Sequence, residues 1–118
     1  MGGDFNLTDD LRALAGAARA RVRIGYPRWL RLLLWKGVAG ITLGRRIYVA
    51  SGLTQAQLER IIRHELAHVR QIARHGLIAF YWRYLVEYLR HRRRGLPAAA
   101  AYRSISFEEE ALAAEETV

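Results

Sequence analysis

The sequence predicts a single α+β domain over residues 1–118, with a small antiparallel sheet of about three strands, one central helix and further helices. Three observations predict this class. Polar and apolar residues alternate over 21–26 and again over 41–49, as in strands with one buried face. A capping-box start at Thr54 opens a long amphipathic stretch that is typical of a helix. A chain of 118 residues is long enough for one hydrophobic core.

The N-terminal part predicts a helix, a strand and a hydrophobic segment. The helix is expected over 9–20, capped by Thr8, and the strand over 21–26, where Pro27 ends it. The segment from Trp29 to Trp35 is strongly apolar and is edged by cations. Two interpretations of it stay open: a helical turn that fills the core, or an interfacial segment that lies on a membrane.

A hairpin is expected next. Ile41 and Leu43 precede Gly44, whereas Ile47 and Val49 follow it, so that Gly44 marks the turn between two strands. The free edge of a sheet can bind an extended peptide as an additional strand. We therefore expect the strand that directly precedes the central helix to offer an edge where an extended segment could bind.

The central helix is predicted between Thr54 and Gly76, because Thr54 with Gln57 forms a capping box and glycine is a natural stop. On a helical wheel, arginines gather on one side. The apolar residues gather on the other: Leu58, Ile61, Ile62, Val69, Ile72 and Ala73.

This helix carries the motif His64-Glu65-Leu66-Ala67-His68, which reads H-E-x-x-H. Residues four apart on a helix have Cβ atoms about 5–6 Å apart, so both imidazoles can reach one zinc ion. Glu65 falls inside the apolar stripe, where an unpaired carboxylate is costly unless a cation compensates it. A catalytic zinc needs one more protein ligand and a water, and Glu65 could act as the general base for that water.

The C-terminal part predicts two more helices. The first runs from Leu77 to about Arg94 and stops at Gly95. A second capping box, Ser106 with Glu109, predicts the start of the other. The expected packing face of the first helix consists of Phe80, Tyr81, Tyr84, Leu85, Tyr88 and Leu89.

The third zinc ligand is expected in the last of these helices. If Glu109 is used by the cap, Glu108 and Glu110 remain, and Glu108 shares the apolar face of Ala111 and Leu112. We therefore choose Glu108. The alternative that these acids only favour a helix N-terminus stays open.

Composition limits the site and the partners. The chain has no cysteine, which excludes disulfides and thiolate zinc clusters, leaves nitrogen and oxygen ligands for zinc, and makes the cytoplasm the default location. The net charge is +8, and all basic residues lie between Arg12 and Arg103. Such a surface allows peripheral contact with anionic lipid, although a solvated face is its commonest meaning; we do not expect nucleic-acid binding to be the function.

With these motifs the chain resembles the gluzincin branch of zinc metallopeptidases, in which a glutamate on a later helix completes H-E-x-x-H. Glu108 to Ala111 looks like the E-x-x-A of the prenyl-protein endopeptidase group, although Leu112 stands where that group has aspartate. The short chain is similar to minimal, zincin-like gluzincins. The resemblance implies that His64, His68 and Glu108 bind zinc and that Glu65 activates water.

The expected function is therefore zinc-dependent hydrolysis of peptide bonds in a peptide or protein substrate. The alternative is a non-catalytic, metal-containing binding module that docks on a membrane surface or a protein partner through its basic face. Tyr102 is a candidate for stabilising a tetrahedral intermediate, with a plain core tyrosine as the other interpretation. Gln71 could orient a ligand or line the cleft.

Overall fold

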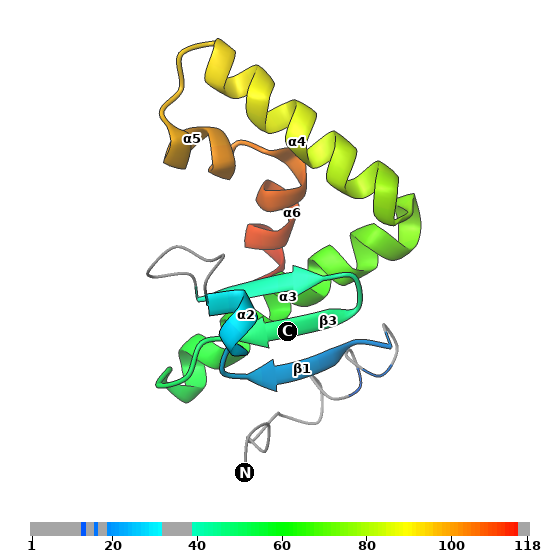
Figure 1. Cartoon of the computed structure of the whole chain (residues 1–118), viewed down its shortest axis with the longest axis vertical. Helices are drawn as coiled ribbons and strands as arrows, with labels where there is room; N and C mark the ends of the chain where they lie inside the picture. The colour runs from blue at the N-terminus through cyan, green and yellow to red at the C-terminus, as the bar shows by residue number, and fades with distance from the viewer. Residues whose placement is uncertain (1–12, 14–15, 17–18, 32–38, 116–118) are drawn as a thin grey trace.

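The structure, a computed structural model, describes residues 13, 16, 19–31 and 39–115. A small sheet with α3 across one face forms one half of the molecule, and α4, α5 and α6 form the other half (Figure 1). This arrangement confirms the α+β class. The elements are β1 (Arg21–Ile24), α2 (Arg28–Arg31), β2 (Gly40–Leu43), β3 (Arg46–Val49), α3 (Gln55–His75), α4 (Leu77–Arg93), α5 (Ala98–Arg103) and α6 (Ser106–Ala114).

Two N-terminal expectations are only partly described. The helix expected over 9–20 lies almost entirely outside the described residues, as does the segment 32–35. The part of the hydrophobic stretch that is described is α2, where Leu30 is buried and Trp29 is exposed. None of the described helices is long and apolar enough to cross a membrane.

The sheet has the strand order β1-β3-β2. Strands β2 and β3 form the expected antiparallel hairpin, and Gly44 at its turn has φ +64°, a conformation that favours glycine. Strand β1 pairs with β3 in parallel, so the expectation of a wholly antiparallel sheet was wrong. The reason is that no tight turn joins β1 to its partner: residues 25–45, including α2 and β2, intervene, and a connection of this length permits parallel pairing. Strand β2 remains at an edge.

Helix α3 begins and ends where the sequence predicts. The Gln57 amide donates to Thr54 Oγ1 at 3.2 Å, and the Thr54 amide donates to Gln57 Oε1 at 3.0 Å. Gly76 ends the helix with φ +86°. One face of α3 packs on the sheet and forms a core of Ile47, Val49, Leu58, Ile62, Leu66 and Val69.

A second core joins the end of α3 to α4 and α6, and its buried members are Ile72, Phe80, Ile105 and Phe107. Only part of the expected packing face of α4 takes part. Phe80 is buried and Tyr84 and Tyr88 pack against the core, whereas Leu85 and Leu89 are exposed, which corrects the prediction. The helix carries a second apolar stripe that includes Leu85 and Leu89, whereas Phe80, Tyr84 and Tyr88 are the residues that pack with Ile72 of α3.

The predicted capping box of α6 was also wrong. Ser106 is the first helical residue, Ile105 is the N-cap, and no side chain of α6 caps the helix. Instead Glu87 of α4 accepts hydrogen bonds from the Ser106 amide and from Ser106 Oγ, both at 2.8 Å. A carboxylate from the neighbouring helix thus satisfies a free N-terminal amide.

Candidate metal centre

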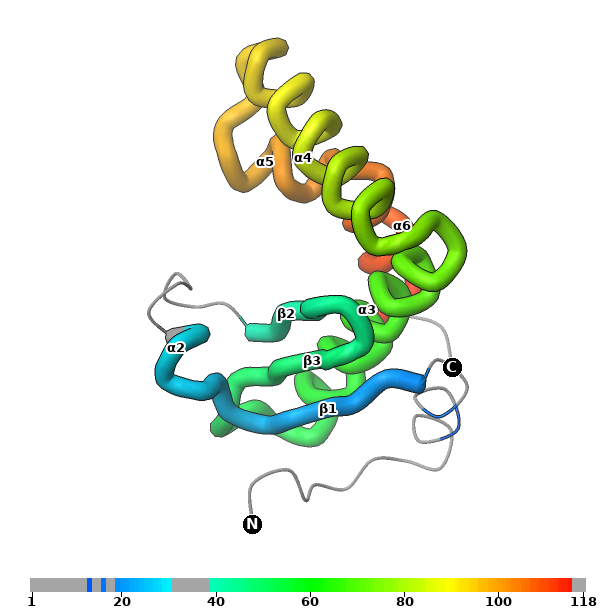
Figure 2. Tube along the Cα trace, turned by 45° about the vertical axis from the view of Figure 1, so that its right-hand side comes forward, coloured from blue at the N-terminus to red at the C-terminus, as the bar shows by residue number. Residues whose placement is uncertain are grey.

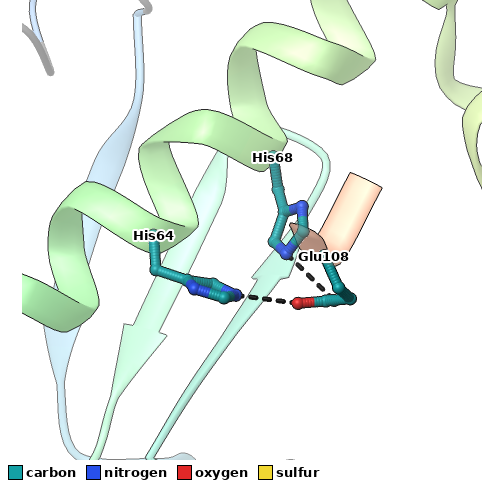
Figure 3. Close-up of side chains that lie close together, drawn as sticks. All are labelled: His64, His68 and Glu108. Atoms are coloured by element: carbon teal, nitrogen blue, oxygen red, sulfur yellow. Dashed lines mark hydrogen bonds and ion pairs between the residues drawn. The ribbon is translucent and has the colours of Figure 1, made fainter. Parts of the chain in front are cut away.

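Three side chains converge between α3 and α6 (Figure 3). Glu108 Oε1 lies 2.8 Å from His64 Nε2, and Glu108 Oε2 lies 3.1 Å from His68 Nε2. One ligand atom from each residue lies within 4.8 Å of the others. Two ligands of a tetrahedral zinc ion are about 3.3 Å apart, so the three side chains need only small shifts to share one ion. The sequence-predicted ligands are therefore brought together.

The spacing within each helix positions these groups. His64 and His68 lie one helical turn apart on α3, and Glu108 lies in the first turn of α6. Ala111, one turn after Glu108, is fully buried, and its small side chain lets α6 approach α3 closely. The sequence placed Glu108 on an apolar face with Ala111 and Leu112. Of these two, only Ala111 is buried, because Leu112 is exposed.

Each imidazole is held by a partner on its other nitrogen. His68 Nδ1 donates to Gln71 Oε1 at 2.8 Å, and His64 Nδ1 donates to Glu115 Oε2 at 2.8 Å. In the structure each Nε2 atom donates to Glu108; a metal ion that took the place of this proton would meet a neutral imidazole that donates through Nδ1 and carries its lone pair on Nε2. Both Nε2 atoms can therefore face a metal ion, and an oriented ligand of this kind binds metal more tightly.

Gln71 also ties the two helices together. The side-chain nitrogen Nε2 of Gln71 donates to the Phe107 carbonyl at 3.0 Å and to Glu110 Oε1 at 3.1 Å. The sequence left two roles open for Gln71: to orient a ligand or to line the cleft. Its hydrogen bond to His68 fits the first role. Glu110, the ligand candidate that we did not choose, therefore accepts a hydrogen bond from Gln71.

The charges of the centre attract a cation. Although burial opposes it, the carboxylates of Glu108, Glu65 and Glu115 raise the pKa of His64 to about 9. Burial also opposes ionisation of Glu108, but hydrogen bonds from the two histidines hold the pKa of its carboxyl below the usual range. Two nitrogen donors and one carboxylate oxygen are a ligand set that zinc accepts. The residues present therefore fit the metal.

Glu65 lies beside the triad, with 7% of its surface exposed. Burial raises the pKa of its carboxyl, and Thr42 Oγ1 of β2 donates to Glu65 Oε1 at 2.8 Å. A carboxylate with a raised pKa is a better general base near neutral pH. The hydrogen bond from Thr42 gives this carboxylate a partner within the otherwise apolar stripe of α3.

A cavity of about 320 Å³ opens in front of these carboxylates. Strand β2 forms one wall, and α4 forms another with Phe80, Tyr81 and Tyr84. Gly40 comes so close to α3 that a Cβ atom there would lie 2.7 Å from Ile61 Cγ2 and 3.4 Å from Glu65 Oε2. A larger residue at position 40 would therefore disturb the general-base candidate.

Hydroxyl groups surround the same cavity. The Tyr84 hydroxyl donates to Glu108 Oε2, and the Tyr81 hydroxyl donates to the Thr42 carbonyl at 3.0 Å. Tyr102 lines the cavity and is 45% exposed, so it is not a plain core tyrosine. Burial raises the pKa of both Tyr84 and Tyr102, which keeps their hydroxyls protonated as donors.

Sequence reasoning missed Thr42, Tyr84 and Glu115. One signal was available: Glu115 lies seven residues after Glu108, and residues seven apart share a face of a helix. No comparable signal exists for Thr42 or Tyr84, because they reach the site from other elements. Comparison of the chain with protein-family models, curated proteins and solved structures finds no match.

Proposed function

We propose that the protein is a zinc-dependent metallopeptidase that hydrolyses peptide bonds. The observation that carries the proposal is the convergence of His64, His68 and Glu108 beside the buried carboxylate of Glu65. Without a metal ion, protonated histidines can balance the charge of the two buried carboxylates, and a divalent ion at the triad would take over that compensation for both. A zinc ion held there would polarise a carbonyl group and acidify a water molecule.

Glu65 is the proposed general base. Its carboxylate faces the cavity, so it can take the proton of an attacking water and later give it to the leaving amine. The Thr42 hydroxyl fixes the orientation of that carboxylate. General-base catalysis of this kind contributes about 10²–10⁴-fold in rate.

The edge of the sheet supports an extended peptide as the substrate. Within the described part of the chain β2 pairs with β3 alone, and Gly40, Ile41, Thr42 and Leu43 line the cavity together with Glu65. A peptide added along this edge would place a peptide bond in front of the triad. Tyr102, whose protonated hydroxyl lines the same cavity, is a candidate for stabilising a developing oxyanion, whereas the Tyr84 hydroxyl already donates to Glu108.

Two substitutions separate metal binding from catalysis. Glu65→Gln keeps the side-chain shape and an acceptor for Thr42, so we expect zinc content to stay at that of the parent while cleavage of a peptide library falls about 10²-fold or more. Glu108→Gln should lower zinc affinity. Metal analysis and cleavage are measured on the same preparations.

The result that would overturn the proposal is equally specific. A fully zinc-loaded parent that cleaves no member of a diverse peptide library would be a non-catalytic metal module instead. Equal turnover by the parent and Glu65→Gln would remove Glu65 from the general-base role.

A further inference from the structure

The outer face of α4 carries a row of large apolar side chains. Ile78, Trp82, Leu85 and Leu89 follow one another at intervals of four, three and four residues, so they lie on one side of the helix. Their exposed fractions are 85%, 67%, 48% and 49%, respectively. We call these four residues the outer stripe. Exposed apolar rows of this length mark interaction surfaces.

The outer stripe faces away from the rest of the described structure. The opposite side of α4 packs against α3 and α5 and contributes Phe80 to the core. Helix α4 forms the margin of the molecule in both views, with α5 and α6 on its inner side (Figures 1 and 2). The stripe is therefore accessible along the full length of the helix.

Positive charge lies at one end of this stripe. Arg90, Arg92, Arg93 and Arg94 follow Leu89 and are exposed. Three of them, with Val86 and Leu89, surround a hollow of about 450 Å³ that combines apolar and guanidinium groups. The sequence of α4 contains one acid, Glu87, and it is bound to Arg83 and Ser106. No carboxylate of α4 is left to neutralise the arginines.

We propose that the outer stripe docks on an anionic membrane surface. Helix α4 would lie in the plane of the interface, with the stripe in the acyl-chain boundary and the arginines on lipid phosphates. Tryptophan favours this boundary, and arginine side chains can reach from an apolar surface to a charged headgroup. The sequence left an interfacial role open for Trp29 to Trp35, most of which lies outside the described residues; the outer stripe is a separate candidate on α4.

Charge complementarity decides between a membrane and other occupants. A second copy of the chain would bring the same arginines and no free acid of α4, so the pairing lacks opposite charge. Nucleic acid would neutralise the arginines but leave Ile78 and Trp82 in water. An anionic bilayer satisfies both the apolar row and the cations.

Vesicle binding tests the proposal. The zinc-loaded protein should co-sediment with phosphatidylcholine vesicles that contain about one third phosphatidylserine. It should bind vesicles of pure phosphatidylcholine at least tenfold more weakly, because each arginine near an anionic surface raises the binding affinity about fivefold. In a Trp29→Phe, Trp35→Phe variant, fluorescence of the remaining Trp82 should shift to shorter wavelength on binding. No binding to anionic vesicles would overturn the proposal.

Matched variants assign the binding to this face. Trp82→Ser with Leu85→Ser should reduce binding at least tenfold, whereas Leu112→Ser, at an exposed leucine of α6, should not. Arg93→Glu with Arg94→Glu should reduce binding similarly. Arg60→Glu with Arg70→Glu, which makes the same change in net charge on α3, should have a smaller effect. Equal loss in both arginine pairs would show general charge attraction and overturn the assignment to α4.

Self-association is the remaining outcome. A concentration-dependent dimer in analytical ultracentrifugation that Leu85→Ser abolishes would show that a second copy covers the stripe, and would overturn membrane docking. These measurements do not depend on peptidase activity. Vesicle binding by a protein that cleaves nothing would sustain this inference while the proposed function fails.

Discussion

Glu115 and His64 are joined across two helices: Glu115 Oε2 lies 2.8 Å from His64 Nδ1. The carboxylate sits at the C-terminal end of α6, two turns beyond Glu108, and contacts the ring nitrogen opposite the proposed ligand atom. A single short helix thus supplies both a proposed ligand and the group that orients another.

Loss of this contact should weaken metal binding. We expect Glu115→Ala to lower zinc affinity about 10–100-fold, because His64 loses the acceptor that fixes its tautomer and ring orientation. Competition with a chromogenic chelator measures the affinity. Glu109→Ala, at an exposed acid of the same helix, is the control and should leave affinity near that of the parent. Equal affinities for Glu115→Ala and the parent would contradict the orienting role.

Metal should stabilise the fold. A ligand present at about 1,000 times its dissociation constant adds about 4 kcal/mol to the free energy of unfolding. In a domain of this size, we expect EDTA to lower the thermal midpoint of the zinc-loaded protein by more than about 10 °C. Glu108→Ala should respond far less, since it lacks one ligand. A parent midpoint that EDTA does not move would argue against a metal centre.

Gly40 should tolerate no side chain. Its replacement by alanine puts a Cβ atom 2.7 Å from Ile61 Cγ2, which is attached to a branched carbon and cannot swing away. We expect Gly40→Ala to cost about 1–3 kcal/mol in urea unfolding and to lower peptide cleavage by moving β2 and Glu65 apart.

Two further variants check the cause. Gly16→Ala, where a Cβ atom would meet nothing within 4 Å, should not lower stability, because alanine is the better helix former at this helical position. Combining Gly40→Ala with Ile61→Ala removes the clashing methyl group, so the double variant should be more stable than the sum of the two changes predicts. If the stability changes of the two substitutions simply add, the contact between position 40 and Ile61 does not cause the loss of stability in Gly40→Ala.

Glu87 should stabilise the start of α6 in a pH-dependent way. Burial opposes ionisation, but hydrogen bonds from Ser106 and Arg83 lower the pKa of its carboxyl below the ordinary 4.5. A depressed folded-state pKa gives stability that is present above the unfolded value and is lost as pH falls through the folded one. Glu87→Ala should therefore cost about 1–2 kcal/mol at pH 7, and the cost should shrink below about pH 4.5.

The measurement is urea unfolding of both proteins from pH 7 to pH 3. The difference between the two curves isolates Glu87, because the other acids titrate in both. A cost that is constant across this range would mean that the Glu87 charge does not hold α6.

Local signals predicted the parts that depend on local physics. The capping box at Thr54 and the glycine at 76 define α3 because both act within a few residues. The H-E-x-x-H spacing fixes the two histidines for the same reason. Glu108 does lie against both histidines, although the capping box used to select it does not exist; its role as a metal ligand stays a prediction.

Contacts between distant elements escaped prediction. The cap of α6 comes from Glu87, nineteen residues before Ser106, and the hydroxyl on Glu65 comes from Thr42 on the sheet. Helix α4 has two apolar stripes, and its composition alone does not tell which one packs inward. The parallel pairing of β1 likewise depends on a long connection whose course the sequence does not specify.

The order of the three proposed ligands along the chain has a consequence for biosynthesis. The ribosome delivers His64 and His68 first, and the whole of α4 and α5 must emerge before Glu108 does. A nascent polypeptide that stops between them has two imidazoles but no carboxylate to complete the triad. The proposed metal centre would therefore be completed only late in translation, after α3, α4 and α5 have been synthesised.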